Sequence, residues 1–209
     1  MIQGFLILAP MKPLTVLAAL LSLALSAPAL ASPTASTTQE RNAARERKYL
    51  EGFRSKNMDS AYTQYLIGSG YTEGKAVPKD YVKGLSWLRR AAENGEPKAL
   101  TAIGFRYIFG HGVEMSRDEA AKYFAQAAAM GDPYGQTELG NSYLKGYGVA
   151  QDYLKAYMWL SVSVVPSNKN SSSAFKTMEQ IKAKISAAEL ARAIEMARQC
   201  AESKFAKCD

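Results

Sequence analysis

The sequence predicts an all-α fold, a right-handed α/α superhelix in which three helical hairpins of 36 residues stack side by side. Two series of glycines recur with this period of 36: Gly68, Gly104 and Gly140, and Gly74, Gly110 and Gly146. An aromatic residue recurs with the same spacing at Trp87, Tyr123 and Trp159. A period between about 20 and 50 residues is typical of one supersecondary unit that is copied and stacked. Each unit buries its apolar face only against its neighbours, and such stacks mainly build surfaces for partners.

Residues 1–31 have the order of a secretory signal peptide. The apolar run Leu14–Leu25 follows Lys12 and precedes Ala29–Ala31, after which cleavage is expected. Met11 is an alternative start. The run is shorter than the roughly 20 residues of a membrane-spanning helix, so an uncleaved anchor is the weaker alternative. We therefore expect an exported protein, periplasmic or extracellular, with no stable membrane anchor after cleavage.

The elements that follow are expected in a simple order. Residues 32–38 are small and polar and predict a flexible leader, and residues 39–60 predict a helix that caps the open end of the stack. Residues 61–165 hold the three repeats, in phase as 61–96, 97–132 and 133–168. Residues 166–209 are expected to form C-terminal capping helices and a tail, because terminal units of a repeat array need one soluble face.

The second copy shows why each repeat should form two helices. Pro97 suits the first turn of a helix, and Gly110 suits its left-handed end. Ser116 and Glu119 have the spacing of a capping box for the second helix, and Asp80 and Asp152 predict the caps in the other copies. The glycine at Gly104 and its equivalents lies inside the first helix, where it costs roughly 0.5–1 kcal/mol relative to alanine. Close packing should offset that cost, and the side chains expected in these gaps are Trp87, Tyr123 and Trp159 or their neighbours.

The C-terminal segment predicts two more helices, at about residues 172–184 and 187–201. Ser186 and Glu189 form a second capping-box pattern, and the expected apolar stripe is Leu190, Ile194 and Ala197.

The repeats resemble the Sel1-like repeat family, which is related to the tetratricopeptide repeats. The third copy carries the resemblance through Leu139-Gly140, Tyr143, Gly146, Gly148-Val149, Asp152, Lys155-Ala156 and Trp159. The first copy fits less well, with Ala76 and Gly84 in place of an expected glycine and alanine. The resemblance covers about residues 61–165 and implies a helical superhelix that binds proteins or peptides, often in the bacterial envelope. It implies no shared catalytic residue.

Cys200 and Cys208 are expected to form a disulfide in an oxidising compartment. Eight residues of continuous helix span about 12 Å, whereas bridged Cα atoms lie within about 7 Å, so the last helix would have to end near Ser203. The separation is also similar to that of the paired cysteines in cysteine-rich members of the family. Two free thiols on a frayed tail are the alternative.

The sequence gives little support for nucleic-acid binding, a metal site or catalysis. The formal charge is +7, but acidic residues interrupt the basic stretches, so we expect no nucleic-acid partner. His111 is the only histidine, is expected to be exposed in a loop, and leaves little for a metal site or a catalytic triad. Ser142 and Lys145 match the Ser-x-x-Lys spacing of penicillin-recognising enzymes, without the other motifs of that class. We therefore expect no catalytic residue, metal or cofactor.

The predicted function is a non-catalytic adaptor or regulator of the cell envelope that binds a protein or peptide on the concave face of the stack. Phe105 is the expected anchor, with packing against a neighbouring repeat as the alternative. Two rival functions remain, a cell-wall or β-lactam hydrolase and a self-associating structural protein. The candidate partner-binding residues are Tyr65, Ser69, Thr101, Phe105, Thr137 and Asn141.

Overall fold

The computed structural model describes residues 37–165 and 171–208. The predicted signal peptide, most of the predicted leader and the loop at residues 166–170 lie outside this range. The chain divides into two units, residues 1–39 and 40–209, and the second contains the repeats. The described residues form nine α-helices: α1 (Thr38–Arg54), α2 (Ala61–Glu73), α3 (Tyr81–Glu93), α4 (Pro97–Phe109), α5 (Arg117–Ala129), α6 (Pro133–Lys145), α7 (Tyr153–Val162), α8 (Ser171–Lys182) and α9 (Ala187–Glu202).

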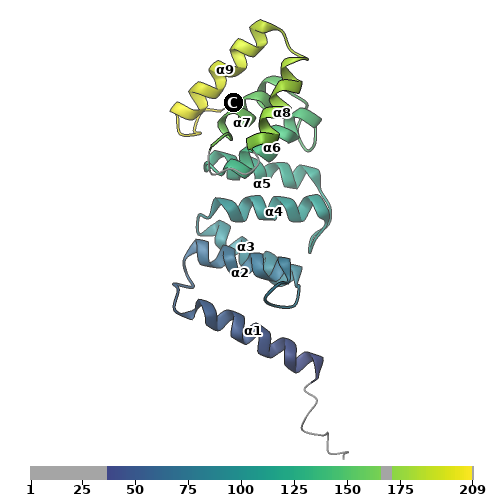
Figure 1. Ribbon diagram of the computed structural model, residues 1–209, viewed down its shortest axis with the longest axis vertical. Helices are drawn as coiled ribbons and strands as arrows, with labels where there is room; N and C mark the ends of the chain where they lie inside the picture. Colours follow the sequence, from purple (N-terminus) through teal and green to yellow (C-terminus); the bar gives the residue numbers. More distant parts are fainter. Residues whose placement is uncertain (1–36, 166–170, 209) are drawn as a thin grey trace, which may run out of the picture. The chain divides into compact units, whose positions relative to one another are not determined.

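Helices α2 to α7 form three antiparallel hairpins that follow one another in the stack (Figure 1). Each of these helices packs against the next one in sequence, and α4 also contacts α2 and α6, the first helices of the neighbouring hairpins. No strand occurs in the described part of the chain. The predicted all-α stack of helical hairpins is therefore confirmed.

Side-chain caps start these helices at the predicted positions. Asp80 accepts a hydrogen bond from the backbone N–H of Lys83, and Asp152 accepts two from the first turn of α7. Gly110 ends α4 with a φ of 66°, in the left-handed region that glycine occupies without strain. The capping box predicted for α5 is only half formed: Ser116 caps the N–H of Glu119, but the Glu119 carboxylate contacts Lys122 instead. The box predicted for α9 is complete.

The helix-interior glycines lie where two helices approach most closely. A Cβ atom placed on Gly104 would lie 2.5 Å from the ring of Phe124, and one on Gly140 would lie 2.8 Å from Leu160. Gly68 faces Leu88 in the same way. The gaps are thus filled by the neighbours of the three recurring aromatic residues, and a ring fills only the middle one.

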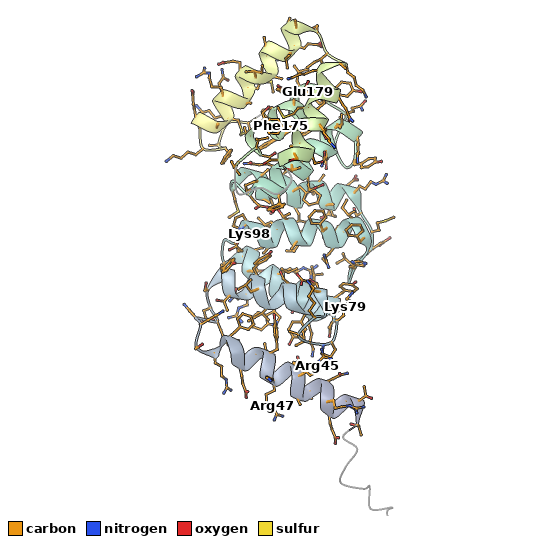
Figure 2. All side chains as sticks on the ribbon, viewed as in Figure 1. Arg45, Arg47, Lys79, Lys98, Phe175 and Glu179 are labelled. Carbon is orange, nitrogen blue, oxygen red and sulfur yellow. A yellow bond between two sulfur atoms is a disulfide. The ribbon has the colours of Figure 1, made fainter. Side chains whose placement is uncertain are left out.

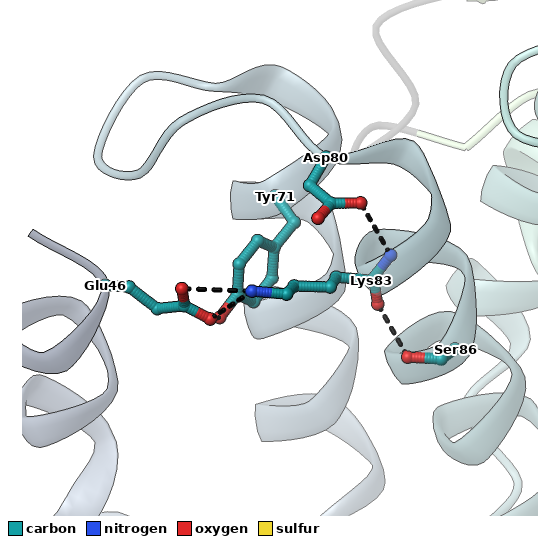
Figure 3. Close-up of polar contacts among 5 residues, drawn as sticks. All are labelled: Glu46, Tyr71, Asp80, Lys83 and Ser86. Carbon is teal, nitrogen blue, oxygen red and sulfur yellow. Dashed lines mark hydrogen bonds and ion pairs between the residues drawn. The ribbon is translucent and has the colours of Figure 1, made fainter. Parts of the chain in front are cut away.

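The helix α1 covers the first repeat through one polar and one apolar contact. Glu46 accepts hydrogen bonds from the hydroxyl of Tyr71 at 2.7 Å and from the ammonium of Lys83 at 2.8 Å (Figure 3). These two donors, Lys83 first, lower the pKa of the Glu46 carboxyl. Tyr49, Leu50 and Phe53 pack against the buried side chains of Ile67, Tyr71 and Val77.

The other end of the stack is closed by α8, α9 and the tail. Cys200 and Cys208 form a disulfide with their Cα atoms 4.6 Å apart, and α9 ends between them at Ser203. The apolar stripe predicted for α9 is partly wrong. Ile194 is 51% exposed, because the buried face follows Ala193, Ala197 and Cys200, three and four residues apart. Within the described ranges, no helix is both long and apolar enough to cross a membrane.

Candidate partner-binding site

Three of the predicted site residues meet around one pocket on the side of the first helices. This pocket, called the α4 pocket below, has a volume of about 330 Å³ and is lined by Tyr65, Lys98, Thr101, Ala102, Phe105, Asp132 and Tyr134. Tyr65 comes from α2, Asp132 and Tyr134 come from the start of α6, and the others from α4. The pocket therefore exists only because consecutive hairpins bring equivalent helices side by side.

A buried polar pair fixes one wall of the α4 pocket. The Thr101 hydroxyl donates to the Asp132 carboxylate at 2.5 Å, and the same carboxylate oxygen accepts the backbone N–H of Gly135 at 2.9 Å. Asp132 is thus the N-cap of α6 as well as a lining residue, and it is only 3% exposed. A buried carboxylate needs such donors, so Thr101 holds the start of α6 in place.

Positive charge stands at the mouth of the same pocket. Lys98 projects from the start of α4 (Figure 2) and its ammonium lies 5.3 Å from the centre of the Tyr62 ring. Lys98 takes part in none of the ion pairs found among the described residues. Tyr62 is 49% exposed and lies against Tyr65, with ring centres 6.0 Å apart. An aromatic rim and an unpaired ammonium therefore face solvent together.

Phe105 is both a lining residue and a part of the core. Its ring meets Phe124 edge-on at 5.3 Å and lies beside Phe109 at 6.4 Å, and it packs against the buried cluster around α5 and α7. Replacing Phe105 would therefore disturb the packing of α4 on α5. Phe105→Ala is therefore expected to lower the stability of the fold, whatever its effect on a partner.

The other three predicted residues do not line the α4 pocket. Ser69 is half-buried, and its backbone carbonyl accepts the Thr72 hydroxyl. Thr137 is buried and donates to the carbonyl oxygen of Pro133 at 2.9 Å. Asn141 hydrogen-bonds the side chain of Glu138, whose pKa is raised by burial.

Sequence reasoning missed Lys98, Ala102, Asp132 and Tyr134 as lining residues. A signal for two of them was available, because Lys98 and Tyr134 occupy the repeat position of Tyr62, 36 residues apart. Asp132 was recognisable as a helix cap because it precedes a proline that starts a helix.

The two residues considered for catalysis are engaged in the fold. The Ser142 hydroxyl is nearly buried and donates to the carbonyl oxygen of Glu138 at 2.8 Å, and the Lys145 ammonium lies over the Tyr147 ring. His111 is half-buried rather than exposed, because its ring stacks on Tyr81 with centres 4.3 Å apart.

Comparison with known proteins agrees with this architecture. The Sel1 repeat model matches residues 61–96, 97–132 and 133–162. The crystal structure of a Sel1 repeat protein from Oxalobacter formigenes is 28% identical with a TM-score of 0.57, over 67% of this chain and 56% of that one. A second structure, c5321, is described as a protective antigen present in uropathogenic Escherichia coli strains and as displaying an SLR fold. It is 23% identical with a TM-score of 0.61, over 85% of this chain and 37% of that one, so it shows the fold alone.

The chain thus spans little more than half of the first of these structures and less of the second. No curated protein sequence matches it. Helical arrays of this kind generally provide scaffolds for protein interactions. Residues 61–162 are three Sel1 repeats, and the chain is a Sel1-like repeat protein.

Proposed function

We propose that this protein is a non-catalytic adaptor of the bacterial cell envelope that holds a peptide segment of a protein partner in the α4 pocket. The observation that supports this most is the pocket itself, where three consecutive first helices supply aromatic, apolar and cationic side chains to one volume of about 330 Å³. A pocket of this size accommodates one or two side chains rather than a folded domain.

The lining indicates which segment fits best. Tyr65, Phe105 and Tyr134 offer ring surface for an apolar or aromatic side chain. Lys98 offers an ammonium without an internal carboxylate partner, which favours an acidic residue or a free C-terminal carboxylate beside that side chain. The Asp132 carboxylate is already held by Thr101 and Gly135, so it does not need the ligand as a donor.

Affinity capture from the envelope fraction, followed by selection from a random peptide library, tests this proposal. The bound peptides are expected to combine an aromatic or aliphatic residue with a carboxylate. Lys98→Glu reverses the charge at the mouth, and Ala102→Arg fills the pocket, so each should weaken binding at least tenfold. Lys176→Glu, at an exposed position on α8, makes the same charge change away from the pocket and should leave binding unchanged.

Retained binding in both pocket variants would refute the assignment of the α4 pocket. Circular dichroism of each variant excludes loss of fold as the cause of a weaker signal. Phe105→Ala is a poor probe for this purpose, because the ring also packs against Phe124.

The enzyme alternative makes a different prediction. A labelled β-lactam acylates Ser142 only if its hydroxyl reaches substrate, and this hydroxyl is nearly buried and donates to Glu138. We expect no labelling, whereas stoichiometric labelling lost in Ser142→Ala would favour a hydrolase.

The envelope location is supported by the apolar N-terminal run and by the disulfide between Cys200 and Cys208. Fractionation of cells that express the chain, with a reduced and oxidised gel shift, tests both features. Recovery of the protein only in the cytoplasm with free thiols would refute the location.

A further inference from the structure

Because the repeats are equivalent, each groove between two second helices has a counterpart 36 residues away along the chain. The tail of the chain packs on the second-helix side of the last hairpins. Ala197, Cys200, Met196, Phe205 and Cys208 belong to one apolar cluster together with Ala125, Ala128, Leu139, Trp159 and Val162 of the last two repeats. This groove between α5 and α7, called the closed groove below, is thus filled by α9 and its disulfide-closed loop.

Two contacts describe how the tail is seated. Helix α9 packs along α7, and the small side chains of Ala197 and Cys200 on its buried face belong to the closed-groove cluster, whereas Ala193 is buried in the neighbouring cluster of α7 and α8. Phe205 then turns back and covers Gly131, where a Cβ atom would lie 3.0 Å from its ring. A small-residue helix face followed by one aromatic ring is therefore the shape that this groove accepts.

The equivalent groove one repeat earlier is open. A cavity of about 540 Å³ lies between α3 and α5, lined by Arg89, Ala92, Glu93, Leu100, Ile103, Tyr123, Gln126, Ala129 and Met130. Five of these residues stand 36 positions before members of the cluster that contains the tail: Arg89, Ala92, Ile103, Tyr123 and Gln126. Gly95, the equivalent of Gly131, has no atom within 4 Å of its Cβ position. The open groove therefore repeats the floor of the closed groove without its occupant.

The two grooves differ in the polarity of their rims, and this difference indicates which side chains a ligand of the open groove should carry. Ala125 and Val162 of the closed groove are replaced by Arg89 and Gln126 in the open groove, and Glu93 adds a carboxylate to the lining of the open groove. Neither Arg89 nor Glu93 takes part in an ion pair among the described residues. They lie one turn apart on α3, so a helix in the groove meets one cation and one anion on the same side.

We propose that the open groove binds an amphipathic helix of a protein partner. This helix carries a stripe of small side chains against Ala92 and Ile103, opposite charges facing Arg89 and Glu93, and an aromatic residue that covers Gly95. Met130, which is 47% exposed at the rim, adds an adaptable apolar contact. The site lies on the second-helix side, whereas the α4 pocket lies on the first-helix side, since the neighbouring residues Leu100 and Thr101 line the two different cavities. The two cavities share no lining residue.

The C-terminal segment that fills the closed groove can be used as a probe for the open groove. A synthetic peptide of residues 187–208, oxidised and fluorescently labelled, contains the small-residue stripe, both signs of charge and Phe205. We expect it to bind the full-length protein. Ala129→Arg, at an exposed lining position at the end of α5, should weaken this binding at least tenfold. Ala183→Arg, at an exposed position just after α8, is the matched control and should have no effect.

Two further variants separate this site from the alternatives. Phe205→Ala in the peptide should weaken binding, and a photoreactive residue at that position should cross-link to peptides that contain Gly95. Lys98→Glu should leave peptide binding unchanged, so failure of the α4 pocket and failure of this groove are distinguishable.

Absence of saturable peptide binding would overturn the proposal, as would binding that Ala129→Arg leaves intact, because the peptide would then enter the closed groove by displacing α9. Dimerisation of the full-length protein that Ala129→Arg abolishes would assign the groove to a second copy and would also overturn it.

Discussion

Gly104→Ala tests the close packing of the hairpins directly. The added Cβ atom would lie 2.5 Å from the Phe124 ring, whereas ordinary contacts begin at 3.4 Å. Phe124 is 2% exposed and is also held edge-on by Phe105, so its ring has little room to retreat. Overpacking of this kind costs about 1–3 kcal/mol, and the gain in helix propensity returns about 0.5–1 kcal/mol. We expect a net loss of about 1 kcal/mol, and of at most about 2.5 kcal/mol, in the free energy of unfolding.

Urea denaturation of the oxidised protein, followed by far-ultraviolet circular dichroism, measures this change. Gly52→Ala in α1 is the matched control, since open space surrounds its Cβ position. That variant should be neutral or more stable, by up to about 1 kcal/mol. In a Phe124→Ala background the loss from Gly104→Ala should shrink, because the ring that opposes the new methyl group is gone. A Gly104→Ala protein as stable as wild type would refute the packing argument.

Three further changes probe other contacts of the stack. Thr101→Val removes the hydroxyl that donates to the buried Asp132 carboxylate. The free energy of unfolding should therefore fall by about 1.5–3 kcal/mol in urea titrations. An unchanged value would contradict this role of Thr101. Cys200→Ser with Cys208→Ser opens an eight-residue closure and should cost about 2–3 kcal/mol, with faster protease cleavage after α9. Because the pKa of Glu46 is lowered by Lys83 and Tyr71, its contribution is complete above its ordinary value of 4.5 and is lost as the pH falls through the lower folded value. Hydrogen exchange in α1 should therefore speed up in that acidic window, after correction for intrinsic rates, and Glu46→Gln should remove the effect.

Much of the fold could be predicted from local sequence. Proline, aspartate and serine mark helix starts because each satisfies or removes an unpaired backbone donor, and the structure places Pro97, Asp80 and Ser116 in these roles. The partners of individual side chains could be predicted less well. The Glu119 carboxylate pairs with the Lys122 ammonium instead of completing the capping box. The His111 ring stacks on Tyr81 instead of facing solvent. In both cases several partners are within reach of the side chain, and the local sequence pattern does not show which of them is bound.

The candidate site shows the same division. Tyr65, Thr101 and Phe105 were predicted to share a surface, and they line one pocket because α2 and α4 are equivalent helices of successive hairpins. Asp132 joins them because its carboxylate accepts the Thr101 hydroxyl of α4, whereas Ser69, Thr137 and Asn141 do not line the pocket.

A period of 36 residues, with glycines and caps in register, is enough to determine helical hairpins that must stack, since no single hairpin can bury its own apolar face. Which grooves of the stack are filled is decided by tertiary structure alone. The tail closes the groove between α5 and α7, where the rim is Ala125 and Val162, and leaves open the one where Arg89 and Gln126 stand. The physical reason is that occupancy depends on desolvation and fit between segments far apart in the chain, which a local pattern does not encode.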